Sequence, residues 1–162
     1  MESSVTHNYR SELTDSVGRS RAIVVVSDVT AAVVRRFFPG SAGKVTVIPP
    51  GVDDSFRQPP PDSTRLPQLP EKFYLSVGST GPRKNFPSLA PHLAAARIPW
   101  VIVGPPGEDE IPLRAACTAH GVALIRLPGV DDARLNGLYR RAVALLSASH
   151  PGMASAAKTK NV

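Results

Sequence analysis

Cysteine is scarce in this sequence. Cys117 is the single cysteine among 162 residues, which excludes an intramolecular disulfide and any metal site built from several thiolates. A reducing environment fits that scarcity. Long apolar runs are also missing: none approaches the roughly 20 residues of a membrane span, and residues 1–21 hold no apolar core of signal-peptide length. We therefore expect a cytoplasmic location, with at most peripheral contact with a membrane.

Acidic residues are outnumbered by basic ones, 13 to 19, which gives a formal net charge of +6. Such an excess is compatible with nucleic acid, an anionic membrane surface or a phosphorylated substrate as partner. Aromatic residues make up only 6% of the chain, and the basic residues are scattered without an interleaved aromatic platform. We therefore expect no nucleic-acid partner, and a basic nucleic-acid binder is the weakest of the alternatives.

The first part of the chain has a strand, helix, strand pattern. The β-branched runs Ile23–Val26 and Val45–Ile48 predict two strands. Between them, Ser27 and Asp28 suit the start of a helix, whose apolar positions recur at helical spacing as far as Pro39-Gly40: Val29, Ala32, Val33 and Phe37. Residues 53–70 are rich in proline, a composition that resists helix and sheet interior, and are predicted to be an interdomain linker.

After residue 70 the sequence alternates between strand and helix patterns. Apolar runs predict strands at Phe73–Val77, Trp100–Val103, Val122–Leu127 and Ala142–Leu146. Helical spacing predicts helices at Pro87–Arg97, Ile111–His120 and Ala133–Arg141. This alternation predicts an α/β fold with a parallel sheet covered on both faces. Residues 150–162 break the pattern, so we expect an incomplete sheet whose open apolar surface favours self-association.

The loop after Val77 carries the clearest chemistry. It lies at the carboxyl end of a strand, where open parallel sheets bind their ligands, and it precedes a predicted helix whose free N–H groups would attract an anion. Gly78 and Gly81 allow a close backbone approach. Arg83 and Lys84 add a forked guanidinium and a point charge, which suit a diphosphate. The competing interpretation is a solvated basic pair, and the position at the strand end favours phosphate binding.

Several other motifs are missing or have simpler interpretations. Gly43-Lys44 is followed by Val45, which lacks the hydroxyl of a Walker loop, and no G-x-G-x-x-G occurs. The four histidines show no metal-site spacing, and Cys117 is interpreted as a packing residue. Asn85 is a candidate helix cap. Asp131-Asp132 is interpreted first as a cap for the helix Ala133–Arg141, ahead of a catalytic acid pair.

Five strings of the sequence, taken in order, resemble glycosyltransferase family 4. Each is weak alone, but their order and spacing make the resemblance specific from about Arg19 to Ser149. The strings are Val25-Val26-Ser27-Asp28, the run KVTVIPPGVD from Lys44 to Asp53, Leu75-Ser76-Val77-Gly78 with Pro82-Arg83-Lys84-Asn85, the run LPGVDD from Leu127 to Asp132, and Leu138-Tyr139-Arg140-Arg141-Ala142.

The resemblance implies the GT-B architecture, in which two Rossmann-like domains face each other. The acceptor binds mostly to the first domain, and the nucleotide-sugar donor binds to the second. On this basis residues 1–52 are the remnant of the acceptor-side domain. Residues 71–149 are the first four βα units of the nucleotide-sugar-binding domain, and residues 150–162 are an aberrant tail.

The resemblance also assigns the site. It implies that Arg83 and Lys84 contact the donor diphosphate, with the two glycines in the same loop, and that Gly129, Val130 and Asp131 lie beside the nucleobase. The family transfers hexoses, mannose among them, from a nucleoside-diphosphate sugar with retention. It uses no metal or other cofactor, and we expect a saccharide or lipid-linked acceptor.

One departure from the family affects the expected activity. The family has Glu-Gly-Phe-Gly and a second glutamate that contact the ribose and the donor sugar, where this sequence has His150-Pro151-Gly152-Met153. The catalytic residues are therefore not identified. We expect a truncated member that is inactive in transfer by itself. The alternative from another class is a non-catalytic nucleotide-binding or interaction module.

Overall fold

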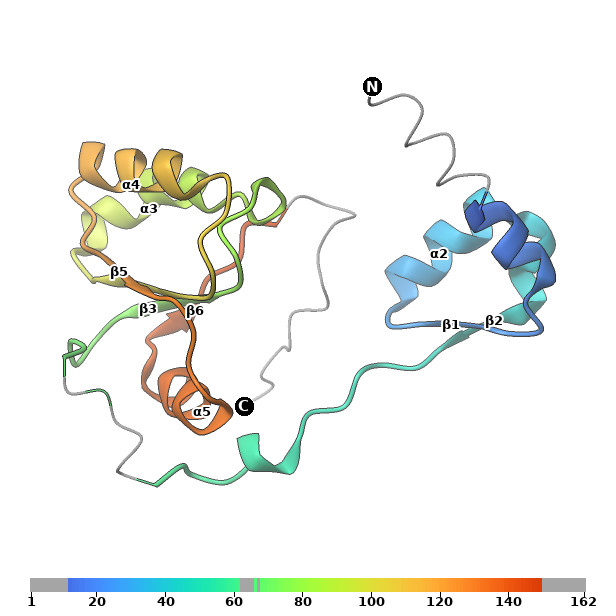
Figure 1. Cartoon of the computed structure of the whole chain (residues 1–162), viewed down its shortest axis with the longest axis horizontal. Helices are drawn as coiled ribbons and strands as arrows, with labels where there is room; N and C mark the ends of the chain where they lie inside the picture. The colour runs from blue at the N-terminus through green and yellow to red at the C-terminus, as the bar shows by residue number, and fades with distance from the viewer. Residues whose placement is uncertain (1–11, 62–65, 67, 150–162) are drawn as a thin grey trace. The chain divides into compact units, whose positions relative to one another are not determined.

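The computed structural model describes residues 12–61, 66 and 68–149, so the predicted tail lies outside the described residues. Two compact units separate between Gly51 and Val52, and each contains a parallel sheet with helices packed against it (Figure 1). The α/β class predicted from the sequence is confirmed. None of the helices in the described part of the chain has the length and apolar character needed to cross a membrane.

The first unit is built on a two-stranded parallel sheet. β1 (Ile23–Val25) pairs with β2 (Val45–Val47), helix α2 (Asp28–Phe37) and the 3-10 helix η1 (Pro39–Lys44) connect them, and residues 12–19 are also helical. Ser27 caps α2, because its Oγ accepts a hydrogen bond from the backbone N–H of Thr30 at 3.2 Å. The predicted start of this helix is confirmed.

The apolar stripe predicted on α2 is largely exposed. Val29, Val33 and Phe37 are 69%, 46% and 59% exposed, whereas Ala31 is buried. Val24 on β1 is 61% exposed as well. Parallel sheets are normally covered on both faces. In the first unit, apolar side chains of β1 and α2 remain exposed, so the described residues do not bury this apolar surface.

The second unit has a four-stranded parallel sheet in the order β5-β4-β3-β6. The strands are β3 (Tyr74–Val77), β4 (Trp100–Val103), β5 (Leu124–Leu127) and β6 (Ala144–Leu145). From β3 the chain adds β4 and then β5 on one side, and it returns with β6 to the other side of β3. The order therefore reverses between β3 and β6, which is the kind of position where doubly wound sheets bind ligands. The arrangement is consistent with a Rossmann-like fold.

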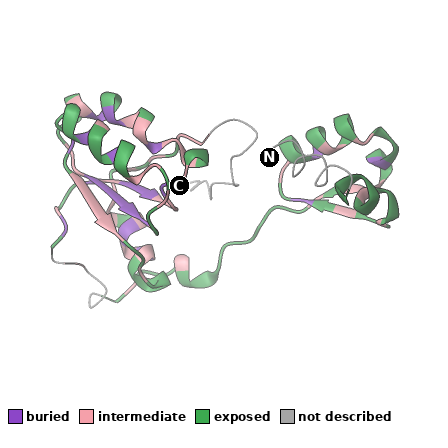
Figure 2. Cartoon of the chain, turned by 45° about the horizontal axis from the view of Figure 1, so that its top comes forward, coloured by how far each residue is buried: buried purple, intermediate pink, exposed green. Residues whose placement is uncertain are grey.

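Helices cover both faces of this sheet. α3 (Ala90–Leu93) and α4 (Glu110–Ala119) lie on one face, and α5 (Asp132–Arg141) lies on the other (Figure 1). The strands β3 and β4 in the middle of the sheet are the most deeply buried (Figure 2). The core under α3 and α4 consists of Phe86, Ala90, Leu93, Trp100, Ile102, Leu113, Cys117 and Val122. The core under α5 consists of Leu69, Phe73, Leu75, Val101, Val103 and Leu138.

The single helix predicted at Pro87–Arg97 is wrong. The structure has three short pieces instead, η5 (Phe86–Leu89), α3 and η6 (Ala94–Ala96), and a further 3-10 turn, η4 (Pro82–Lys84), precedes them. Pro87 and Pro91 lack the N–H that a continuous helix needs. Asn85 adopts the left-handed conformation with φ of 49°, and its side chain makes no cap hydrogen bond, so the predicted Asn85 cap is also wrong.

The last strand is shorter than predicted and lies at the sheet edge. Ala142 still belongs to the end of α5, because its N–H donates to Leu138 O at 2.9 Å. Val143 and Leu145 are 52% and 42% exposed, so the apolar surface expected at this edge is present. The self-association expected from it stays a prediction.

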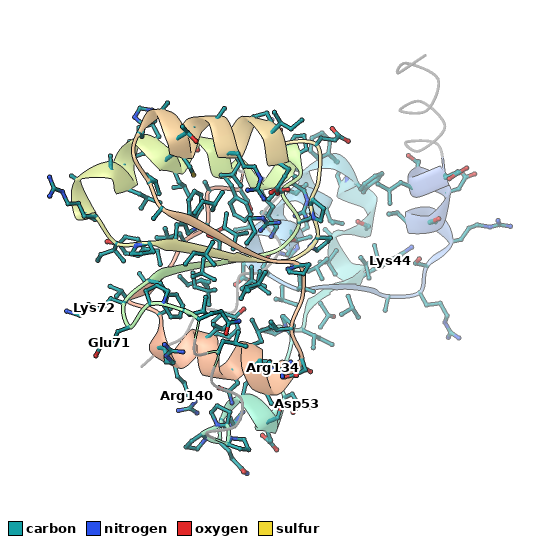
Figure 3. All side chains as sticks on the ribbon, turned by 60° about the vertical axis from the view of Figure 1, so that its left-hand side comes forward. Lys44, Asp53, Glu71, Lys72, Arg134 and Arg140 are labelled. Atoms are coloured by element: carbon teal, nitrogen blue, oxygen red, sulfur yellow. The ribbon has the colours of Figure 1, made fainter. Side chains whose placement is uncertain are left out.

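Helix α5 also holds the start of the proline-rich segment through η2 (Asp54–Phe56). Nδ2 of Asn136, which is 3% exposed, donates to the carbonyl oxygens of Ser55 at 2.7 Å and Gln58 at 2.8 Å. Arg140 Nε donates to Asn136 Oδ1 at 3.0 Å, and Figure 3 shows Arg140 on the side of α5 that faces this segment. The first residues of the predicted linker are therefore docked on the second unit, and its role as a linker stays a prediction.

Candidate functional site

The loops after β3 and β4 meet at the carboxyl edge of the sheet. Gly78 ends β3 with φ of 138°, and its N–H donates to Val103 O at 2.8 Å. Gly104 ends β4 with φ of 140°, and a Cβ on it would lie 2.4 Å from Gly78 O. Both positions need glycine, because an L side chain rarely adopts this φ and Gly104 has no space for one. The backbone of the candidate loop therefore lies directly against its neighbour.

The side chain of Lys84 folds back over the end of β3. A Cβ on Gly78 would lie 2.9 Å from Lys84 Cε and 3.4 Å from Nζ. The Lys84 N–H donates to Gly81 O at 2.9 Å, which closes the turn η4 and directs the side chain toward the strand. Its ammonium forms no hydrogen bond or ion pair with any residue that the structure describes. A half-buried cation thus lies at the carboxyl end of the strand next to the reversal in strand order.

The other two predicted residues of this loop lie in the same turn. Gly81 precedes η4, and a Cβ on it would lie 3.8 Å from Ser79 Oγ, an ordinary van der Waals contact, so this position has room for a side chain. Arg83 is exposed and lies one residue before Lys84. The structure therefore brings Gly78 and Lys84 together, and the convergence of Arg83 and Lys84 on one anion stays a prediction.

The loop after β3 is not followed by a long helix. The sequence predicted a long helix whose free N–H groups face the ligand, but η4, η5 and α3 have only 3, 4 and 4 residues. Aligned peptide dipoles need a longer helix. The attraction for an anion at this loop therefore comes from the Lys84 charge.

A buried threonine anchors the loop. Thr80 is fully buried, and its Oγ1 accepts a hydrogen bond from Gly107 N at 2.7 Å and donates one to Glu110 Oε2 at 3.0 Å. Its backbone N–H donates to Pro105 O at 3.3 Å, and its carbonyl accepts from Asp109 N at 2.8 Å. Three of the four bonds reach the loop between β4 and α4 and the fourth reaches Glu110, the first residue of α4, so hydrogen bonds join the loop after β3 to the segment Pro105–Glu110.

An ion pair with little exposure supports these hydrogen bonds. Arg126, on β5, lies 3.2 Å from Glu110 Oε2 through Nε, and the two side chains are 11% and 17% exposed. Arg126 also donates from Nη1 to Ile102 O at 3.0 Å and from Nη2 to Gly104 O at 3.1 Å. Arg114 Nη2 lies 2.8 Å from Glu110 Oε1. Burial alone would raise the pKa of Glu110, but the Thr80 hydrogen bond and the two arginines together lower it.

These supporting residues were missed by sequence reasoning. Arg126 interrupts the apolar run Leu124–Leu127, and a charge inside a strand covered on both faces is a signal for a partner. Nothing in the sequence identifies that partner as Glu110, because the pair spans two elements.

The loop after β5 lies at the same edge of the sheet, with β4 between it and β3. Asp131 caps α5: its Oδ1 accepts from Arg134 N at 2.8 Å and its Oδ2 lies 3.4 Å from Arg134 Nη1. The cap interpretation is confirmed. Val130 packs against the core under α5, while a Cβ on Gly129 would meet no atom within 4 Å. The nucleobase role of Gly129, Val130 and Asp131 stays a prediction.

The reversal between β3 and β6 is fixed by a buried hydroxyl. Ser76 Oγ donates to Leu146 O at 2.8 Å and accepts from Trp100 Nε1 at 3.0 Å. Ser76 and Trp100 are both fully buried. The end of β6 is therefore held beside the strand that leads to the Lys84 loop.

The remaining reactive side chains have structural roles. Cys117 is buried in the core under α4, where burial raises its pKa against a smaller opposing effect of Arg114, so its interpretation as a packing residue is confirmed. Within the described ranges, no three or more His, Cys, Asp or Glu side chains gather closely enough to hold a metal ion.

Comparisons with known proteins do not assign the chain to a family. No model of a known protein family matches it, and no curated protein matches it either. The glycosyltransferase resemblance therefore depends on the motifs of the sequence, and the α/β class depends on the parallel sheets.

Proposed function

We propose that the second unit binds a nucleoside-diphosphate sugar and that the protein is glycosyltransferase-like, with the GT-B architecture. The transferred group is a hexose, mannose being one candidate, and transfer proceeds with retention to a saccharide or lipid-linked acceptor. The observation that carries the proposal is the Lys84 ammonium over Gly78, at the carboxyl end of β3 and without a described protein partner. The cytoplasmic location inferred from the single cysteine belongs to the same proposal.

The chemistry of this loop favours a diphosphate over a smaller anion. Lys84 supplies one charge beside the backbone of Gly78, and Arg83 supplies a second from the adjacent position of the turn η4. Two cations on adjacent residues of one turn suit two linked phosphates, since arginine can bond two phosphate oxygens at once. The Asp131 loop follows β5 at the same edge, where a nucleoside can extend from the diphosphate.

A non-catalytic nucleotide-binding module is the second candidate. The two carboxylates that the structure fixes at this edge are already engaged: Glu110 by Thr80 and Arg126, and Asp131 by the first turn of α5. Neither is available to orient a sugar. These two carboxylates therefore give no support to transfer by the described part of the chain.

Calorimetry with UDP, GDP, ADP and inorganic pyrophosphate tests the proposal. Lys84→Gln should weaken binding by the value of a charge-assisted hydrogen bond, about 1.5–3 kcal/mol, or roughly 10- to 150-fold in Kd. Lys72→Gln is the matched control, because Lys72 is exposed and lies before β3, at the amino ends of the strands and away from the Lys84 loop (Figure 3). Lys72→Gln should leave Kd unchanged.

The outcomes separate the candidates. Binding followed by transfer from a nucleoside-diphosphate hexose supports the enzyme, and binding without transfer supports the module. Absence of binding to every probe, or equal loss from both lysine variants, contradicts the site. Binding to RNA or DNA with a steep salt dependence would instead indicate a nucleic-acid binder.

A further inference from the structure

The turn that carries Lys84 has no long helix to hold it in place. η4 has three residues, and the next residue, Asn85, has a left-handed backbone. Short 3-10 turns have poor hydrogen-bond geometry and contribute little rigidity alone. The position of the Lys84 ammonium must therefore be fixed from outside the turn.

Thr80 supplies that connection. It lies next to Gly81, whose carbonyl accepts the Lys84 N–H and closes the turn. Each of its polar groups, the N–H, the carbonyl and the hydroxyl, is bonded to the segment Pro105–Glu110. The two segments also touch without side chains between them, because a Cβ on Gly107 would lie 2.9 Å from Gly81 N.

The hydroxyl bond is in turn held by a chain of charges. Glu110 accepts from Thr80, and Arg126 pairs with Glu110. Arg126 in turn donates to the carbonyl oxygens of Ile102 on β4 and of Gly104, which directly follows β4. We refer to Thr80, Gly107, Glu110 and Arg126 as the Thr80 network. It joins the ends of β3, β4 and β5 and the start of α4. Among the described residues no buried side-chain nitrogen or oxygen lacks a partner, so the network is fully satisfied.

We propose that Thr80 and Glu110 are positioning residues that hold the Lys84 loop in its anion-binding geometry before the ligand arrives. This inference depends on the proposed function, since it concerns the same loop. A loop that is already ordered loses less conformational freedom on binding, and affinity rises accordingly. The network contacts no ligand itself and acts through the Gly81 to Lys84 turn.

The test compares three variants of the full chain with the wild type. Thr80→Val keeps the shape and removes both hydroxyl bonds, and Thr80→Ser keeps the hydroxyl. Asn136→Ala removes two hydrogen bonds at α5 and controls for a general loss of stability. Two quantities are measured: amide hydrogen exchange of residues 78–85 in the absence of ligand, and Kd for UDP, GDP and ADP.

Thr80→Val should speed exchange in residues 78–85 and weaken nucleotide binding by about fivefold, the factor that corresponds to one net hydrogen bond of about 1 kcal/mol. Thr80→Ser should restore both quantities toward wild type, and Asn136→Ala should change neither. Glu110→Gln perturbs the same network a second way, by removing the charge that pairs with Arg126, and should move both quantities in the direction of Thr80→Val.

Three results would contradict the positioning role of Thr80, and each can be told apart from the others. Unchanged loop exchange in Thr80→Val overturns the positioning role whether or not a nucleotide binds. Faster exchange with unchanged Kd overturns it as well, because order in the loop would then not contribute to affinity. If the wild type binds none of the three nucleotides, the proposed function is overturned and the positioning role for that ligand with it.

Discussion

Replacing Ser76 with alanine tests how much the buried hydroxyl between β3 and β6 contributes to stability. The change leaves Trp100 Nε1–H, which is fully buried, without its acceptor, and it removes the donor to Leu146 O. An unsatisfied buried donor costs about 1–3 kcal/mol, and a lost hydrogen bond costs about 1 kcal/mol more. We therefore expect Ser76→Ala to lower the free energy of unfolding by about 2–4 kcal/mol.

The assay is urea unfolding followed by far-UV circular dichroism. With an m-value of about 2 kcal/mol per molar, the expected loss lowers the urea midpoint by roughly 1–2 M. The same substitution is then made in a Trp100→Phe background, where the indole N–H is already absent. There Ser76→Ala should cost only about 1 kcal/mol, because no buried donor is left without an acceptor.

Two results would refute this reasoning. An unchanged midpoint in Ser76→Ala would mean that the hydroxyl contributes nothing. An equal loss in both backgrounds would mean that the indole and the hydroxyl act independently, in conflict with their 3.0 Å hydrogen bond. Trp100 is the single tryptophan of the chain, so its fluorescence checks in the Ser76→Ala variant that the second unit is the part that unfolds.

Three further changes have expected outcomes. The neighbours of Glu110 hold its pKa below the usual 4.5. The carboxylate therefore stabilises the fold above that pH, and this contribution is lost as the pH falls through the lower folded-state pKa. Glu110→Gln should be less stable than wild type at pH 7, and the difference should shrink in acid. Gly104→Ala would place a Cβ 2.4 Å from Gly78 O at φ of 140° and should prevent stable folding, while Gly129→Ala should change stability by less than about 0.5 kcal/mol. Asn136→Ala should cost about 1–3 kcal/mol, because two hydrogen bonds to the carbonyl oxygens of the exposed residues Ser55 and Gln58 are lost.

Unfolding curves measured at several pH values check these expectations. A Glu110→Gln variant whose stability stays parallel to the wild type down to acid would contradict the lowered pKa. A folded Gly104→Ala variant of normal stability would show that the β3 and β4 loops separate easily. A stable Asn136→Ala variant would show that η2 is not held by α5.

Much of the second unit could be predicted from local patterns. The apolar run Trp100–Val103 coincides with β4, and the predicted helices Ile111–His120 and Ala133–Arg141 differ from α4 and α5 by one residue at their ends. These elements follow from side-chain periodicity alone, because each buries one continuous apolar stripe or strand. The helix at Pro87–Arg97 was wrong because its apolar spacing outweighed two prolines, which break the hydrogen-bond ladder in the structure.

The candidate site was predictable only in part. Gly78 and Lys84 follow a recognisable strand, so their place at the sheet edge comes from the sequence. The Thr80 network could not be predicted, because Thr80 and Glu110 are 30 residues apart and Arg126 is a further 16 away. Which of the charged side chains meet at the edge depends on strand order, and strand order is set by packing of the whole unit.

The strand order also has a consequence for the folding kinetics of the second unit. β3, β4 and β5 pair with successive neighbours, whereas Ser76 and Leu146 are joined across 70 residues of chain. Closing the longer loop costs more entropy, and β6 returns only two paired residues for it. We expect β6 to dock last and to detach first, so that the amide of Leu146 exchanges through partial opening. β3, which leads to the Lys84 loop, would then be paired on both sides only in the completely folded unit.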